Sequence, residues 1–278
     1  ARYRESLTGV VQHCKALGVR EIVVMSPGIV DQLFWRMNIT WEQYNENLHA
    51  LRDIAESVAK EEQVRFADVY TAMHTALEAG KKHYGPAFHL TFDGIHPKEN
   101  GHLIMAWQLL KALGMSGDMG RVELGDGNVA AIDTSHWPMC FYGDPSLPDH
   151  PENILPLIPF QEELNRFILH GGVDGPATVR WGEWEYAAKA GELQRGLNLA
   201  AVFPRNPFME SYKKLDDLIR EKQMAEISFI RYVWHGCRQL DTLSPKDKKM
   251  HQSIQYITSS LARVQQEREE EILKAVQP

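Results

Sequence analysis

The pattern of apolar and polar positions divides the first part of the chain into helices and strands. Apolar side chains recur with helical spacing in residues 7–17 and 41–60, which predicts two amphipathic helices. The run Glu21–Met25 is almost continuously apolar, as in a strand buried on both faces, and Val64–Tyr70 predicts a second strand. Helical spacing returns at 71–83 and 100–113. Helices that alternate with strands in this way predict βα units on a parallel sheet, and therefore an α/β fold.

The pattern changes after residue 116. Two short apolar stretches flank the polar residues 125–128, which predicts a β-hairpin. Residues 164–169 and 177–186, with a turn at 171–176 between them, predict a further antiparallel pair. Trp181 and Trp184 are expected to face opposite sides of one strand, because an odd number of positions separates them. Two long stretches of helical spacing follow, at 207–234 and 245–275. We therefore predict an α/β part, a small β-rich extension and a helical tail, which span residues 1–116, 117–204 and 205–278.

Composition and charge narrow the classes of function. The 278 residues are 44% hydrophobic and 24% charged, as in an ordinary soluble globular protein. A net charge of -7 argues against a general nucleic-acid surface, and no apolar run reaches the length of a membrane span. The three cysteines lie far apart and lack metal-ligand spacing. The remaining classes of function are an enzyme and a binding module. The composition does not indicate the cellular compartment.

The predicted parallel sheet is incomplete. Two strands are too few, because parallel strands need neighbours and cover on both faces. We expect the remaining strands either within residues 121–200 or in a segment ahead of Ala1. Ala1 leads directly into the first helical pattern, without the charged and apolar regions of a signal peptide. The chain is therefore expected to begin inside a domain.

The most informative chemistry lies in the pair Asp93 and His96. The two side chains are three positions apart, just before the helical pattern that begins near Asn100. A carboxylate held against an imidazole fixes the ring tautomer and stabilises the imidazolium that forms when histidine takes a proton. The same carboxylate also suits a helix entry, because negative charge is favourable there. The spacing alone leaves both roles open.

The residues around this pair carry a family likeness. The stretch Asp93-Gly94-Ile95-His96-Pro97, followed by Asn100-Gly101-His102 and an apolar helix, resembles the last sequence block of the SGNH (GDSL-type) hydrolases. The upstream order of helices and strands agrees with this likeness. It implies the C-terminal half of a flavodoxin-like SGNH domain, with His96 as catalytic base and Asp93 as the acid that orients it. The later segment Gly196-Leu197-Asn198-Leu199-Ala200, with Asn206-Pro207-Phe208, is similar to the extension of some bacterial relatives.

The same resemblance implies a serine esterase that acts on small acyl esters, such as acetyl groups on carbohydrates. The family's nucleophilic serine, oxyanion glycine and asparagine have no counterpart in this sequence and are expected ahead of Ala1. Ser26 follows a buried strand, but Pro27 after it has no backbone N–H to stabilise an oxyanion, so a structural role is expected. Residues 1–278 alone are therefore expected to be inactive. The alternative is a truncated or degenerate relative that acts as a binding module.

A third hypothesis is a metallohydrolase that uses His89, His96 and His102. Histidine and carboxylate side chains are common metal ligands, but these spacings match no standard motif. We therefore predict neither a metal nor another cofactor. The expected partners are a small-molecule or carbohydrate ester, together with a missing N-terminal segment or a second copy of the chain, and no nucleic acid.

Overall fold

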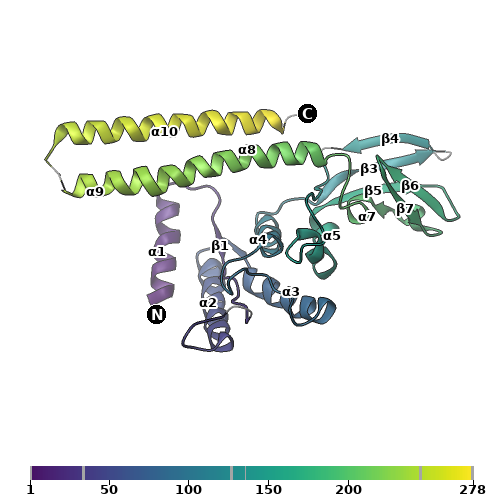
Figure 1. Ribbon diagram of the computed structural model, residues 1–278, viewed down its shortest axis with the longest axis horizontal. Coiled ribbons are helices and arrows are strands. Elements are labelled where there is room, and N and C mark those ends of the chain that lie inside the picture. Colours follow the sequence, from purple (N-terminus) through teal and green to yellow (C-terminus); the bar gives the residue numbers. More distant parts are fainter. Residues whose placement is uncertain (1, 33–34, 126–127, 135, 244–245, 277–278) are drawn as a thin grey trace. The chain divides into compact units, whose positions relative to one another are not determined.

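The computed structural model describes residues 2–32, 35–125, 128–134, 136–243 and 246–276 (Figure 1). The chain separates into two compact units, Ala1–Asn206 and Pro207–Pro278. A break near residue 206 lies close to the predicted start of the helical tail. The predicted boundary between residues 116 and 117 falls inside the first unit and stays a prediction.

The first unit opens with the predicted alternation of helices and strands. Strands β1 (Val23–Met25) and β2 (Arg65–Ala67) pair in parallel, with Val24 opposite Phe66. The helices of this part are α1 (Arg2–Ala16), α2 (Trp41–Glu61), α3 (Val69–Tyr84) and α4 (Glu99–Ala112). Thr40 and Gln43 form a capping box at the start of α2. Among the described residues this sheet has two strands, so the first of the two alternatives, completion by strands within residues 121–200, is wrong.

The two faces of this small sheet have different covers. Val24 of β1 packs with Val11 of α1 and with Ala55 and Ala59 of α2. Met25, the next residue, packs instead against the larger core that α3 and α4 build. Successive side chains of a strand point to opposite faces, so one apolar run serves both layers.

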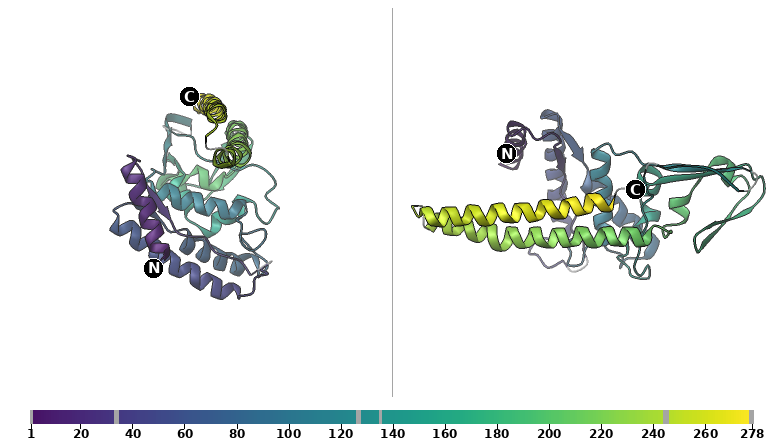
Figure 2. Two further views of the ribbon diagram at one scale, coloured as in Figure 1. Left: turned by 90° about the vertical axis from the view of Figure 1, so that its left-hand side faces the viewer. Right: turned by 90° about the horizontal axis from the view of Figure 1, so that it is seen from above.

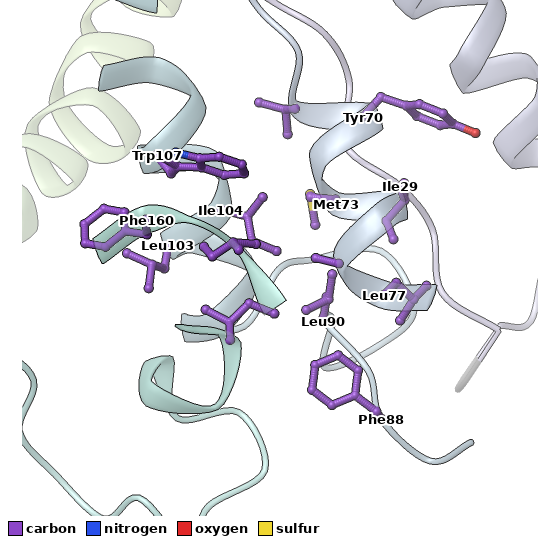
Figure 3. Close-up of a cluster of buried hydrophobic side chains, with 14 of the residues drawn as sticks. Ile29, Tyr70, Met73, Leu77, Phe88, Leu90, Leu103, Ile104, Trp107 and Phe160 are labelled. Atoms are coloured by element: carbon purple, nitrogen blue, oxygen red, sulfur yellow. The ribbon is translucent and has the colours of Figure 1, made fainter. Parts of the chain in front are cut away.

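The larger core joins the α/β part to residues far along the chain. Met73, Leu77, Leu90 and Ile104 pack there around the loop before α4, and Phe160 enters the same cluster with 1% of its surface exposed (Figure 3). Phe160 begins the short helix α5 (Phe160–Leu164), which follows the 3-10 helix η1 (Pro151–Leu157). Full burial of a phenylalanine contributes about 1.5–3 kcal/mol. The α/β part and the extension therefore share one hydrophobic core.

The extension contains the predicted hairpin and one unexpected pairing. Strands β3 (Asp118–Gly125) and β4 (Asn128–Thr134) are antiparallel, as predicted. Strand β5 (Arg166–Gly171) pairs in parallel with β3, and β8 (Leu197–Asn198) completes the order β4-β3-β5-β8. The prediction that residues 164–169 pair with residues 177–186 is therefore wrong: the antiparallel partner of β5 is β8. The short helices α6 (Glu192–Arg195) and α7 (Leu199–Val202) flank β8 in sequence.

The two tryptophans of the extension correct a second expectation. Residues 177–186 form no single strand, because β6 (Ala177–Trp181) turns back at Gly182, whose φ is 65°, into β7 (Trp184–Ala188). Trp181 and Trp184 thus become cross-strand partners, and both pack against the core of the extension. The rule of alternating faces applies only within one strand.

The tail is a helical hairpin. Helix α8 (Met209–Ser228) continues through a π-helical turn, η2 (Phe229–Trp234), into α9 (His235–Leu243), so the helical path runs past the predicted end at residue 234. Helix α10 (Lys248–Ala275) returns along α8 (Figures 1 and 2). No helix in the described ranges has the length and apolar content that a membrane crossing requires.

Candidate active site

The candidate site lies in the loop between α3 and α4, which folds back on itself. Thr91 and Pro97 form an isolated antiparallel bridge, and the backbone N–H of Lys98 donates to the Leu90 carbonyl oxygen at 2.8 Å. The tip turns at Gly94, whose φ of 91° favours glycine. These bonds turn a connecting segment into a defined platform for side chains.

Gly101 lets helix α4 begin directly against this platform. A Cβ atom at Gly101 would lie 2.7 Å from the Leu90 carbonyl oxygen and 3.1 Å from the Pro97 side chain. Any other residue would push the helix away from the loop, because backbone atoms cannot move aside cheaply. The Asn-Gly-His stretch of the sequence pattern thus has a local structural reason.

The structure brings the two predicted site residues, Asp93 and His96, into direct contact. Asp93 Oδ2 lies 2.7 Å from His96 Nδ1. The other carboxylate oxygen, Oδ1, accepts the backbone N–H groups of Ile95 at 2.9 Å and His96 at 2.8 Å. The carboxylate is therefore fixed by three bonds at once, and it holds one ring nitrogen of the histidine.

These bonds explain the electrostatics of Asp93. Donation from the His96 backbone, then from the His96 ring and the Ile95 backbone, lowers the pKa of Asp93 to about 2. Hydrogen bonds to the ionised form favour that form over the protonated one. Asp93 is therefore a stable acceptor for the ring proton at neutral pH.

The edge of the His96 ring that carries Nε2 is open. Its side chain is 66% exposed, and the ring of Phe92 stacks on it with centroids 5.6 Å apart. Within the described ranges of the chain, no side chain bonds to Nε2 of His96. A carboxylate that accepts the Nδ1 proton leaves the lone pair on Nε2, the geometry of a general base.

The lowered pKa of Asp93 predicts an acid-sensitive loop. A carboxyl group whose pKa is depressed on folding stabilises the fold in full above its unfolded pKa of about 3.9. That contribution is lost as the pH falls through the window from about 4 to about 2. We expect the difference in unfolding free energy between the wild type and Asp93→Asn to shrink from pH 5 to pH 3. Urea unfolding at both pH values measures it, and a difference that grows on acidification would contradict the assignment.

Ser26 has the structural role expected of it. Its side chain is buried, and its Oγ accepts the backbone N–H of Tyr70 at 2.8 Å and donates to the Pro27 carbonyl oxygen at 3.1 Å. The bond from Tyr70 ties the end of β1 to the start of α3, and the bond to Pro27 is local to the end of β1. The hydroxyl is thus engaged away from His96.

The three histidines of the metal hypothesis do not converge on a common point. His89 Nδ1 contacts the Ala87 carbonyl oxygen at 2.9 Å, and His102 is exposed on α4. In the part of the chain that the structure describes, no group of three His, Cys, Asp or Glu side chains is placed to bind one metal ion.

Sequence reasoning missed the residues that hold the loop in place. Asp31 lies after β1 and is 1% exposed, and Asp149 pairs with Lys98 at 3.0 Å. Asn100 is fully buried, and its side-chain amide donates to the His89 carbonyl oxygen at 3.2 Å. An aspartate shortly after a buried strand was a signal for Asp31, whereas nothing near Asp149 pointed to this loop.

Comparison with known proteins relates the segment that carries this site to a family of hydrolases. Residues 1–109 match the family described as GDSL-like Lipase/Acylhydrolase. This match supports an enzyme that acts on ester bonds, and it agrees with the resemblance that the Asp93–His96 stretch carries. No curated protein matched the sequence.

Solved structures of other proteins are similar to this chain in fold. A gut microbial diltiazem-metabolizing enzyme is similar with a TM-score of 0.65 at 19% identity, over 99% of this chain and 73% of that one. At that identity the likeness concerns the fold alone. An acetyl xylan esterase from Geobacillus stearothermophilus is 25% identical with a TM-score of 0.33, over 40% of this chain and 46% of the esterase.

Proposed function

We propose that residues 1–278 supply the base and the orienting acid of a serine esterase. The observation that carries this proposal is the contact of 2.7 Å between Asp93 Oδ2 and His96 Nδ1, combined with an open Nε2. A paired carboxylate and imidazole in a GDSL-like segment are two members of a Ser-His-Asp triad. The third member, a serine, comes in this proposal from a polypeptide segment other than residues 1–278.

The proposed chemistry follows from the two ring nitrogens of His96. Nε2 takes the proton of the serine hydroxyl while its oxygen attacks the ester carbonyl carbon. The resulting imidazolium keeps its Nδ1 proton on Asp93 and returns the Nε2 proton to the alcohol that leaves. Water then repeats the sequence on the acyl-enzyme, which releases the acid and restores the serine.

The surroundings of His96 support a small acyl group. Phe92, which stacks on the His96 ring, is 57% exposed, and Ile95 of the same loop is 46% exposed. The limited apolar surface that Phe92 offers against the ring suits the methyl group of an acetyl ester better than a long acyl chain. We propose acetyl esters, including those on carbohydrates, as the substrate class.

A covalent fluorophosphonate label tests the proposal. In the natural polypeptide that carries residues 1–278, we expect one labelled serine, outside residues 1–278. Labelling is expected to vanish in His96→Ala and to persist in the matched control His102→Ala, which removes an exposed histidine of the neighbouring helix. Purified residues 1–278 alone are expected to take no label, because they lack the hydroxyl that Nε2 would deprotonate.

The same experiment addresses the second candidate, a binding module without catalysis. This candidate is favoured by one observation: no described side chain supplies a hydroxyl to Nε2 of His96. An unlabelled natural polypeptide would support the binding module and overturn the esterase. A label within residues 1–278 would instead place the nucleophile in this chain and refute the division of the triad.

A further inference from the structure

The loop that carries Asp93 and His96 is held at two points by one buried residue, Asp31. The backbone N–H of Asp31 donates to the Gly94 carbonyl oxygen at 2.8 Å, at the tip of the loop. Its carboxylate oxygen Oδ2 accepts the backbone N–H of Leu90 at 3.2 Å, at the base of the loop. One residue with 1% exposure thus contacts both ends of the segment that presents the pair: its backbone N–H holds the tip, and its carboxylate holds the base.

Asp31 is itself anchored to the helices behind it. The side-chain amide of Asn45 in α2 accepts the Val30 N–H at 2.9 Å and donates to the Val30 carbonyl oxygen at 2.8 Å. The Tyr70 hydroxyl in α3 donates to the Asn45 carbonyl oxygen at 3.0 Å. Val30 and Asn45 are buried. Bonds that are shielded from water therefore lead from α2 and α3 to the loop.

We propose that Asp31 is a positioning residue for the Asp93–His96 pair, an inference that rests on the proposed esterase function. The orientation of the Asp93 carboxylate depends on the N–H groups of Ile95 and His96, which directly follow Gly94 in the chain. The Asp31 carboxylate holds the residue 31 backbone against Leu90, and the N–H of that backbone bonds to Gly94. The side chain therefore sets the position of Gly94, and with it the direction of those two N–H groups, through the backbone of residue 31. A misplacement of about 1 Å in a catalytic group can cost roughly 10²-fold in rate.

A purely structural role would have a different signature. A buried carboxylate that only satisfies a neighbouring N–H group would change stability when removed and leave the geometry of the pair intact. The distinguishing quantity is hence the strength of the bonds between Asp93 and the Ile95 and His96 amides. Water exchange of those two amide protons reports on it directly, and it needs no enzyme activity.

The test is amide exchange by NMR on purified residues 1–278. In Asp31→Ala we expect the Ile95 and His96 amides to exchange at least about tenfold faster, while Asp31→Asn, which keeps an oxygen for Leu90, stays near the wild type. Asp68→Asn is the matched control, because Asp68 caps α3 and binds Arg52 without touching the loop. It is expected to lower the melting temperature and leave both amides unchanged.

The possible results separate the positioning role from the esterase function. Unchanged Ile95 and His96 exchange in a folded Asp31→Ala protein would overturn the positioning role. Should that variant fail to fold, Asn45→Ala, which frees Val30 but keeps the Asp31 carboxylate, must still speed exchange of the same two amides. No effect there would equally refute the proposal. A last combination is faster amide exchange in the Asp31 variant and a natural polypeptide that takes no fluorophosphonate label. That combination would support the positioning role of Asp31 and reject only the esterase.

Discussion

Replacing His96 by alanine in the natural polypeptide is expected to lower kcat for p-nitrophenyl acetate by about 10²–10⁴-fold. The alanine removes the imidazole that the structure places against Asp93, so the serine would have no group to take its proton. KM is expected to change little, because the imidazole acts in the transition state rather than in ground-state binding. Steady-state kinetics over a range of substrate concentrations separates the two constants.

His102→Ala provides the control for that measurement. His102 is exposed on α4, close to His96 in the sequence. Its replacement therefore removes a nearby histidine without altering the contact between Asp93 and His96. Wild-type kcat in His102→Ala together with wild-type kcat in His96→Ala would show that neither histidine serves as base. That result would leave Asp93 and His96 as a helix-entry motif.

Asp93→Asn is expected to lower kcat by up to about 10⁴-fold, the loss known for this change in other triads. An amide nitrogen turned toward Nδ1 donates a proton where the carboxylate accepts one, so the ring would carry its proton on Nε2 and could not act as a base. The bonds from the Ile95 and His96 backbones are expected to survive on the amide oxygen, which keeps the fold. The matched control is Asp53→Asn, an exposed aspartate of α2.

The folding data accompany the kinetic test of Asp93. A loss of kcat with an unchanged far-ultraviolet spectrum and a small change in melting temperature would support the orienting role. Full activity in Asp93→Asn would contradict it, because the contact of 2.7 Å would then have no catalytic consequence.

The parts of the site that the sequence predicts are those whose contacts are local. Asp93 and His96 are three residues apart, so a short loop brings them together whatever the rest of the chain does. Asp31 and Leu90 are 59 residues apart, and their bond exists only because the end of β1 passes beside the loop. Sequence spacing carries no information on such a contact, which is why the anchors of the loop were missed.

The same contrast runs through the fold. Helical periodicity predicts α2 and α4 within a residue or two, because each amphipathic face repeats along its own segment. Strand pairing is a contact between distant segments, and here β5 joins β3 in parallel rather than a neighbour in sequence. The pattern of residues 177–186 did not predict the two-residue turn at Gly182 for a different reason. A tight turn inside an alternating stretch gives the same pattern as one continuous strand.

The burial of Phe160 shows that the α/β part and the extension depend on each other for their packing. The larger core contains residues from α3, α4 and the start of α5, so the GDSL-like stretch buries its surface against the extension. A protein cut at residue 116 would expose that surface to water. Experiments on the candidate site therefore require the extension to be present.

The tautomer of His96 in purified residues 1–278 tests the central claim most directly. Long-range ¹H–¹⁵N NMR of the imidazole ring at alkaline pH distinguishes a proton on Nδ1 from a proton on Nε2. Because Asp93 Oδ2 lies 2.7 Å from Nδ1, we predict the Nδ1–H form, with a lone pair on Nε2. A neutral ring protonated mainly on Nε2, in the wild type, would contradict the assignment of His96 as a base oriented by Asp93.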